Sequence, residues 1–318
     1  PMMARTMAKN ALPISFGFKI AGWLESLIRL DKRFISAEKN YFTLFFGGAV
    51  GAMHGYKNKG KKFTNQLAKN LGFSNSLVPN RVSLETSIDF INSLSFLGVV
   101  IGKISNDIYM LMQQSIDELS EKQGKNQIGS STMPHKVNAY TIYQVLRDAS
   151  LLRGKASGLS DSALTLFEGD SKNDFVLEEI LKDSLILSFN LLKNFNLLLS
   201  KLIINKKKML ENLIKEKEYI ASENIMYKLG KKIGRQRSHA LINKIIKNSI
   251  NNKKSIMSEL LNNKEINGYI NKKQMKKFLN PLDYLGESKS ISLSTYIYSL
   301  KYLKNIQIRI KKRNLSVF

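Results

Sequence analysis

The sequence predicts an all-α fold, in which a bundle of long helices is followed by a smaller helical domain. Apolar residues recur at helical spacing over three long stretches, at about residues 14–40, 85–121 and 173–202. No stretch shows the alternation of apolar and polar residues that is typical of a half-buried strand. Because a long helix is stable only when its apolar face is covered, these stretches favour an extended helical bundle.

The first elements follow from local signals. Pro13 lies where a helix could begin, and the first helix is expected from Ile14 to about Asn40. A short helix from Phe63 to Leu71 is expected inside a loop region, 57–83, that is rich in Gly, Asn and Lys. The next helix is expected to run without a break from Glu85 to Glu121.

The character of the sequence changes after Ile203, where Lys and Asn become abundant and the helical patterns become shorter. We therefore divide the 318 residues into a helical-bundle domain, 1–204, and a C-terminal helical domain, 205–318. Pro1 precedes Met2 and a recognisable motif follows almost at once, so we expect that a further N-terminal region is missing from this chain.

Composition narrows the class of protein. The chain has no cysteine, so it has no disulfide framework, and a cytoplasmic location is expected. The longest apolar run noted, Leu185 to Leu199, is broken by Lys193 and three asparagines, so no membrane span is expected.

Charge is strongly unbalanced, with 50 Lys and Arg against 25 Asp and Glu, a formal charge of +25. One interpretation is nucleic-acid binding. However, the lysines are spread over helix faces, mostly after Ile203, without the interleaved aromatic residues of single-strand binders. We interpret them as solvated faces, expect no nucleic-acid partner, and expect part of the charge to attract a small anionic substrate.

The segment from Gly129 to Asn138 reads Gly-Ser-Ser-Thr-Met-Pro-His-Lys-Val-Asn. The glycine and the small hydroxyl residues allow backbone freedom, and Pro134 then stiffens the chain. Such a loop before a helix can place a hydroxyl, an ammonium and an amide around one small anion. The alternative is a polar loop between helices whose Ser and Thr only cap the next helix.

The whole string resembles the signature loop of the fumarase/aspartase superfamily, Gly-Ser-Ser-x-Met-Pro-x-Lys-x-Asn-Pro. Thr132 and His135 make it similar to adenylosuccinate lyases and to bacterial 3-carboxy-cis,cis-muconate cycloisomerases. Residues 3–17 resemble the first characteristic region of the superfamily, and residues 222–240 and 280–286 resemble the adenylosuccinate lyase C-terminal domain. The resemblance implies a homotetramer with active sites shared between subunits, and it requires neither a metal nor a cofactor.

The resemblance also implies roles for individual residues. Ser130 would remove a proton beside a substrate carboxylate, and Lys136 would stabilise the resulting charge. These two are the predicted catalytic residues. The predicted substrate-binding residues are Arg5, Thr6, Ser131, Thr132, Met133 and Asn138.

Three departures from the superfamily pattern bear on the reaction. Met7 stands where the family has a histidine that acts as general acid or orients the acid, Ala139 replaces a proline, and Tyr143 replaces a glutamate. Methionine cannot transfer a proton. Cleaving fumarate from an amine leaves a strongly basic group that needs a proton, whereas opening a lactone leaves a carboxylate with a reference pKa of about 4. Met7 therefore favours a cycloisomerase.

Two alternatives stay open. One is an adenylosuccinate lyase-like enzyme that cleaves fumarate from a purine nucleotide. Around Glu168 and Asp170, however, both arginines that hold the nucleotide phosphate in that family are absent. The other is a protein that has kept the fold and lost the chemistry, which the changes at Met7, Ala139 and Tyr143 would explain.

Overall fold

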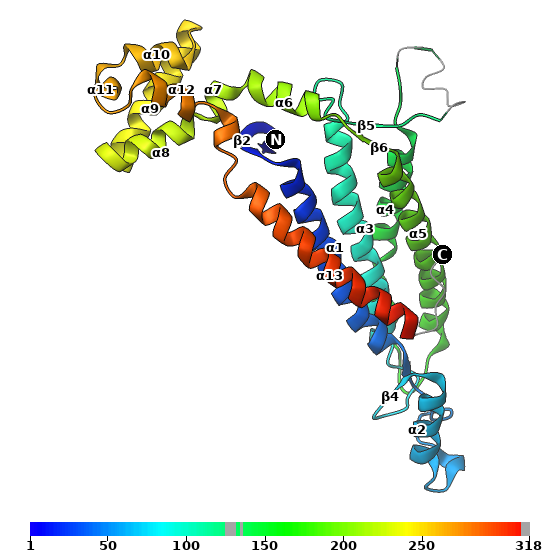
Figure 1. Ribbon diagram of the computed structural model, residues 1–318. Helices are drawn as coiled ribbons and strands as arrows, with labels where there is room; N and C mark the ends of the chain where they lie inside the picture. The colour runs from blue at the N-terminus through cyan, green and yellow to red at the C-terminus, as the bar shows by residue number, and fades with distance from the viewer. Residues whose placement is uncertain (125–131, 134–135, 313–318) are drawn as a thin grey trace. The chain divides into compact units, whose positions relative to one another are not determined.

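The computed structural model describes residues 1–124, 132–133 and 136–312 (Figure 1). The chain forms two compact units. Unit 1 comprises Pro1–Glu25, Gln114–Glu118 and the chain from Ile204 onward, and unit 2 comprises Ser26–Gln113 and Leu119–Ile203. One boundary between the units falls beside the predicted domain division at 204/205, and that division itself stays a prediction.

The predicted all-α class is confirmed, since long helices dominate both units. In unit 2, α3 (Glu85–Leu111), α4 (Tyr140–Lys155) and α5 (Ser171–Lys201) lie side by side (Figure 1). Their buried side chains include Ile101, Ile104 and Ile108 of α3; Ile142, Val145, Ala149 and Leu152 of α4; and Leu191 and Leu198 of α5. A Cβ atom at Gly98 would lie 2.7 Å from the carbonyl oxygen of Ala149, so this glycine lets α3 and α4 approach closely.

Two predicted helix ends are corrected by the structure. The helix expected to reach Glu121 ends at Leu111. It does not resume before Glu121, and Asp117 in this stretch has a left-handed backbone (φ 51°) that is incompatible with a continuous right-handed helix. The helix expected near Pro13 begins later: α1 spans Phe16–Tyr41, and Ser15 Oγ accepts a hydrogen bond from Phe18 N at 3.1 Å. The short helix predicted in the loop region is α2 (Gly60–Leu71).

Pro13 instead lies in a β-hairpin that the sequence pattern did not reveal. Strands β1 (Met2–Thr6) and β2 (Lys9–Ile14) pair antiparallel, with Met3 opposite Pro13. The other strands are shorter: β3 (Thr43–Leu44) pairs with β4 (Ser74–Asn75), and β5 (Leu119–Glu121) pairs with β6 (Leu202–Ile204). These strands are too short for a repeating alternation of apolar and polar residues to be seen.

The C-terminal part of unit 1 is built mostly from short helices and ends in a long one. These are α6 (Lys206–Lys215), α7 (Lys217–Ile220), α8 (Ser222–Ile233), α9 (Arg235–Asn252), α10 (Ile256–Asn262), α11 (Lys264–Asn267), α12 (Lys272–Phe278) and α13 (Ser288–Lys312). The asparagine-rich composition supplies their caps: the side chains of Asn205, Asn263 and Asn271 accept hydrogen bonds from the first turns of α6, α11 and α12.

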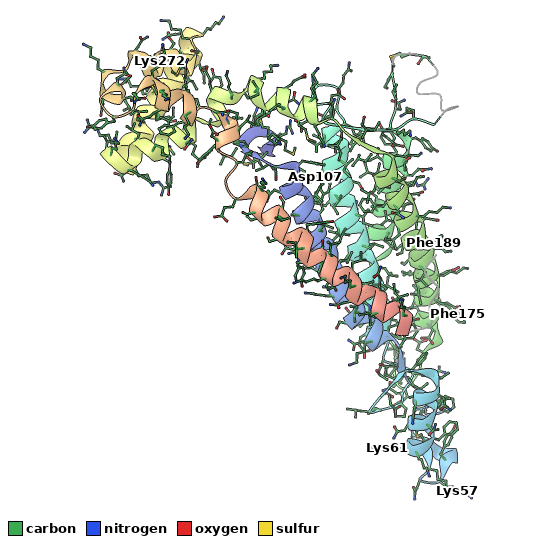
Figure 2. All side chains as sticks on the ribbon, in the orientation of Figure 1. Lys57, Lys61, Asp107, Phe175, Phe189 and Lys272 are labelled. Atoms are coloured by element: carbon green, nitrogen blue, oxygen red, sulfur yellow. The ribbon has the colours of Figure 1, made fainter. Side chains whose placement is uncertain are left out.

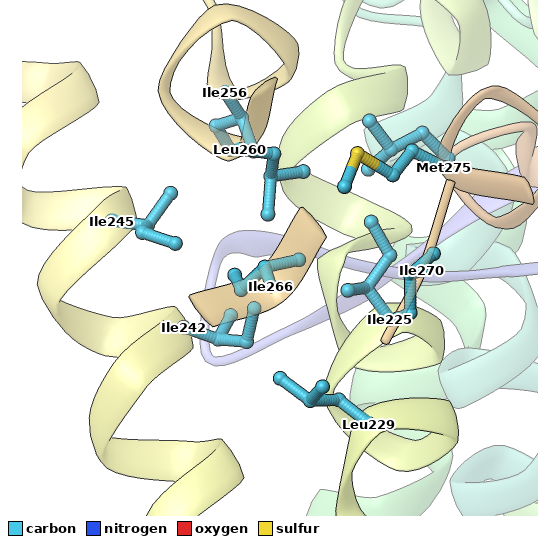
Figure 3. Close-up of a cluster of buried hydrophobic side chains, with 10 residues drawn as sticks. Ile225, Leu229, Ile242, Ile245, Ile256, Leu260, Ile266, Ile270 and Met275 are labelled. Carbon is cyan, nitrogen blue, oxygen red and sulfur yellow. The ribbon is translucent and has the colours of Figure 1, made fainter. Parts of the chain in front are cut away.

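Helices α8 to α12, with the turns between them, enclose a hydrophobic core of their own, which we call the C-terminal cluster (Figure 3). Its buried residues are Ile225, Leu229, Ile242, Ile245, Ile256, Leu260, Ile266, Ile270, Met275 and Leu279.

Among the described helices, α3 is long and apolar enough to cross a membrane by length and composition. The sequence analysis had considered another stretch, Leu185 to Leu199 in α5, as a possible membrane span. In the most apolar window of α3, 44% of the window is buried inside the protein. The absence of a membrane span stays a prediction.

Candidate active site

The segment 129–138 is only partly described. Ser130 and Ser131, predicted as the base and as a substrate-binding residue, lie outside the described residues. Thr132, Met133 and Lys136 are exposed and Asn138 is half-buried; Lys136 N donates a hydrogen bond to Met133 O at 2.9 Å. Helix α4 begins at Tyr140, so the segment leads into a helix as predicted. The catalytic and binding roles of all these residues stay predictions.

The chain on either side of this segment is tied together by a buried carboxylate. Thr141 N donates to both carboxylate oxygens of Glu121, at 3.2 Å and 3.1 Å, and the Thr141 hydroxyl donates to Glu121 Oε1. Lys201 Nζ donates to Thr141 Oγ1 at 3.3 Å and lies 3.8 Å from Glu121 Oε1. The side chain of Glu121 is fully buried, and that of Lys201 is partly exposed.

A second buried carboxylate holds Arg5. The Arg5 guanidinium donates to both oxygens of Glu118, at 3.0 Å and 2.6 Å, and Glu118 is fully buried. Asn212 Nδ2 donates to Glu118 Oε1 at 2.9 Å. A bidentate pair of this kind fixes the direction of the guanidinium. In unit 1, Arg5 therefore joins the β1–β2 hairpin to Glu118, and its contact with a substrate stays a prediction.

Thr6 and Met7 lie at the tip of that hairpin. Thr6 is exposed and pairs with Lys9 across the turn. Met7 and Ala8 both have positive φ angles, 49° and 58°, as in the two-residue turns that suit the twist of a hairpin. The Met7 side chain is 97% exposed. At the position where the superfamily has a histidine, this chain thus presents a side chain without a transferable proton.

Tyr143, which replaces the superfamily glutamate, forms a hydroxyl pair with Tyr109 of α3. The two hydroxyl oxygens are 3.2 Å apart and the ring centroids are 5.6 Å apart. The hydrogen bond with Tyr109, together with partial burial, raises the pKa of Tyr143 above its ordinary value of 10.0. The side chain therefore stays a neutral hydroxyl at neutral pH.

A recess of about 400 Å³ lies elsewhere in unit 2. It is lined by residues between Gly51 and Pro79, including Lys61, Thr64 and Asn65. None of the predicted site residues lines this recess.

Sequence reasoning missed the two carboxylates and, among their partners, predicted only Arg5 as a site residue. Glu118 and Glu121 lie in a stretch that was expected to be the end of a helix. The available signal was a group of three acidic residues, Asp117, Glu118 and Glu121, ahead of the segment 129–138 in a strongly basic chain. Their partners, Arg5, Thr141, Lys201 and Asn212, are distant in sequence and show no such signal.

Comparison with known proteins gives consistent matches. A family model described as lyase matches residues 1–146, and a model described as adenylosuccinate lyase C-terminus matches residues 218–292. Trans-aconitate decarboxylase 1 of Mycosarcoma maydis is 31% identical over 295 residues, which cover 90% of this chain and 58% of that protein. Adenylosuccinate lyase of Methanocaldococcus jannaschii is 28% identical over 287 residues, which cover 89% of this chain and 62% of that protein.

Among solved structures, the 3-carboxy-cis,cis-muconate lactonizing enzyme of Pseudomonas putida superposes with a TM-score of 0.82 at 22% identity. The match covers 95% of this chain and 67% of that chain. The chain thus spans about three fifths of the length of the curated relatives named above.

Proposed function

Because the chain belongs to the fumarase/aspartase superfamily of lyases, we propose that its protein is a lyase or cycloisomerase acting on a small polycarboxylate. Within this proposal, we favour the reaction of a 3-carboxy-cis,cis-muconate cycloisomerase. The observation that carries this choice is Met7, a fully exposed side chain without a proton to transfer, at the position of the superfamily histidine.

The proposed reaction passes through a carbanion. Ser130 acts as an alkoxide, which the nearby positive charge of Lys136 stabilises. It removes the proton from a carbon next to a substrate carboxylate and becomes a neutral hydroxyl, and the electron pair left on the carbon is delocalised onto that carboxylate. Lys136 and Asn138 stabilise this charge through an ammonium group and an amide. The bond from the neighbouring carbon to the leaving oxygen of the lactone then breaks, and the electron pair stays on that oxygen as a carboxylate. The lactone-forming direction is the reverse of these steps.

This leaving group explains why a histidine is dispensable. A departing carboxylate is stable without a proton at neutral pH, since its reference pKa is about 4. A departing amine needs a proton as it leaves, and the Tyr109–Tyr143 hydroxyl pair, with the pKa of Tyr143 raised above 10.0, is a weak acid for that task. Cleavage of adenylosuccinate is therefore the less favoured candidate.

Decarboxylation is a second candidate, and the 31% identity to trans-aconitate decarboxylase 1 favours it specifically. Trans-aconitate, like 3-carboxy-cis,cis-muconate, carries three carboxylates. Loss of CO₂ breaks a carbon–carbon bond and also leaves an electron pair that a neighbouring carboxylate and the ammonium of Lys136 can stabilise. The departing CO₂ needs no proton, but the carbon that keeps the electron pair must take one, and the hydroxyl of Ser130 is the proposed donor because Met7 has no transferable proton.

We also propose that the protein works as a homotetramer with shared active sites. Apolar side chains that stand exposed on α5 support this, among them Phe175 (72% exposed) and Phe189 (68% exposed) (Figure 2). Contiguous exposed apolar side chains on a long helix are typical of surfaces that a partner covers.

The test uses the complete gene product with 3-carboxy-cis,cis-muconate, followed by the loss of conjugated-diene absorbance. We expect turnover that disappears in Ser130→Ala and persists in Ser290→Ala, an exposed serine on α13. Trans-aconitate, followed by release of CO₂, and adenylosuccinate are the second and third substrates. Turnover of adenylosuccinate alone would overturn the preference for a polycarboxylate, and no turnover of any of the three would favour a non-catalytic protein.

A further inference from the structure

Helix α4 begins without a capping side chain of its own. Its N-cap residue is Ala139, which forms no side-chain hydrogen bond to the first turn. The first amides of a helix need acceptors, and a carboxylate there also interacts favourably with the helix dipole. In this protein the acceptor comes from the other side of the segment 122–140: both oxygens of Glu121, in β5, accept from Thr141 N.

The same carboxylate is reached by the last residue of α5. Lys201 Nζ lies 3.8 Å from Glu121 Oε1 and donates to the Thr141 hydroxyl at 3.3 Å. The backbone adds a further link, because Lys122 N donates to Lys201 O at 2.8 Å. The three residues Glu121, Thr141 and Lys201, which we call the clasp, therefore join three elements at one point.

Because the polar groups of the clasp are buried, they need hydrogen-bond partners within the protein. Glu121 and Thr141 are both almost completely buried. A buried carboxylate is stable only when donors surround it, and here an amide, a hydroxyl and an ammonium do so. Removing the carboxylate of Glu121 would leave the buried amide and hydroxyl of Thr141 without their acceptor, so Glu121 is the central residue of the clasp.

The clasp lies close in sequence to two predicted site residues, Lys136 and Asn138. It fixes the chain immediately before Lys122 and again at Thr141, and both Lys136 and Asn138 lie within five residues of Thr141. Groups that stabilise charge in a transition state act only when they are held close to one geometry, and a displacement of about 1 Å can cost about 100-fold in rate.

We propose that Glu121, Thr141 and Lys201 are positioning residues that hold the start of α4 against β5 and thereby the placement of Lys136 and Asn138 just before this helix. The effect on catalysis rests on the proposed function. The effect on the backbone around α4 does not, so the two are tested by separate measurements.

The first measurement is amide hydrogen exchange of the complete gene product. In Glu121→Ala we expect the amides of residues 136–143 to exchange at least about tenfold faster than in the wild type. The matched control is Asp148→Asn, which alters another buried carboxylate of α4, one that accepts a hydrogen bond from Asn194 of α5 at 2.8 Å. Its exchange at residues 136–143 should stay within about twofold of the wild type.

The second measurement is steady-state kinetics with the polycarboxylate that the wild type turns over. We expect kcat to fall about 100-fold in Glu121→Ala and about tenfold in Thr141→Val, while Thr141→Ser, which keeps the hydroxyl, restores kcat to near the wild-type value. Asp148→Asn should change kcat less than about threefold. If Glu121→Ala does not fold, Lys201→Met replaces it in both measurements.

The outcomes separate the two ideas. Faster exchange at 136–143 without activity in the wild type would support the clasp and count against the proposed function. Wild-type activity with unchanged exchange and unchanged kcat in the clasp variants would overturn the clasp and leave the proposed function standing. A fall in kcat in Asp148→Asn equal to that in Glu121→Ala would show that only general stability matters, and would also overturn the clasp.

Discussion

The C-terminal cluster and the helices α3, α4 and α5 use the same kinds of residues but complete their packing differently. In the cluster, ten apolar side chains from α8 to α12 and their connecting turns are buried against one another (Figure 3). Helix α5 also buries residues such as Leu191 and Leu198, yet Phe189 is largely exposed and Leu192 is half-exposed. Figure 2 shows Phe175 and Phe189 along this exposed side of α5.

This difference in burial indicates that the C-terminal cluster needs no partner to complete its core, whereas α5 does. Short helices connected by tight turns can close a core around themselves. The long helices α3, α4 and α5 have more apolar surface than they cover for one another, so their outer faces favour a partner. The predictions below test this contrast, beginning with the largest expected effect.

The largest effect is expected from truncating a residue in the centre of the C-terminal cluster. Leu260 is fully buried, so Leu260→Ala should lower the free energy of unfolding by about 2–5 kcal/mol. Denaturant titration at several protein concentrations measures this. The loss should be independent of concentration, because the cluster is complete within one chain. In the control Leu192→Ala, which alters a half-exposed residue of α5, any loss should depend on concentration. A concentration-dependent loss in Leu260→Ala would contradict the contrast.

The second prediction concerns the exposed face of α5. Burying a phenylalanine stabilises an interface by about 1.5–3 kcal/mol, and an aspartate in its place adds a desolvation cost. Phe189→Asp should therefore weaken self-association at least about tenfold, as measured by sedimentation velocity. The control is Ile250→Asp on α9, which also replaces an exposed apolar residue but lies beside the complete C-terminal cluster. Equal weakening by both variants would remove the distinction between the two surfaces.

Sequence patterns predicted the helices well where the signal was local. The stretches 14–40 and 173–202 correspond closely to α1 and α5. The pattern failed at Asp117, since no repeat of apolar residues reveals a left-handed backbone. It also failed at the hairpin turn, because Met7 and Ala8 are not the Gly or Asn that usually mark positive φ angles.

The candidate site shows the same limit. The string 129–138 and the change at Met7 are visible in the sequence, and they carry the proposed function. The ion pair of Arg5 with Glu118 joins residues 113 positions apart, and the contact of Thr141 with Lys201 joins residues 60 positions apart. Such pairs follow from the fold, so a single sequence does not reveal them.

The third prediction tests whether the inner faces of the long helices are as tightly closed as the C-terminal cluster. In Gly98→Ala, the new Cβ would lie 2.7 Å from Ala149 O, so α3 and α4 must separate slightly. The expected cost is about 1–3 kcal/mol in the free energy of unfolding, measured by denaturant titration. Gly154→Ala on α4 is the control, because a Cβ there meets no atom within 4 Å and should leave stability unchanged or raise it by about 0.5–1 kcal/mol. A neutral Gly98→Ala would mean that the inner packing is loose.

The smallest effect is expected from the hydroxyl pair between α3 and α4. The pKa of Tyr143 is raised chiefly by its hydrogen bond with Tyr109, whereas the pKa of Tyr284 is raised chiefly by burial and then by Glu223. Tyr109→Phe should thus lower the pKa of Tyr143 toward its ordinary value of 10.0 and leave that of Tyr284 unchanged. Nuclear magnetic resonance titration of labelled tyrosine side chains, assigned with Tyr143→Phe, measures both.

The sign of the linked change in stability follows from the raised pKa. A hydroxyl whose pKa is higher in the folded than in the unfolded protein stabilises the fold fully below the unfolded pKa, and this contribution is lost as the pH rises through the folded value. Wild-type protein should therefore lose more stability above about pH 10 than Tyr109→Phe does. An unchanged pKa of Tyr143 in Tyr109→Phe would show that the two helices do not hold these hydroxyls together in solution. The contacts that remain between α3 and α4 would include the close approach at Gly98, the hydrogen bond from Arg153 Nη1 to Gly98 O at 2.9 Å, and the buried apolar residues.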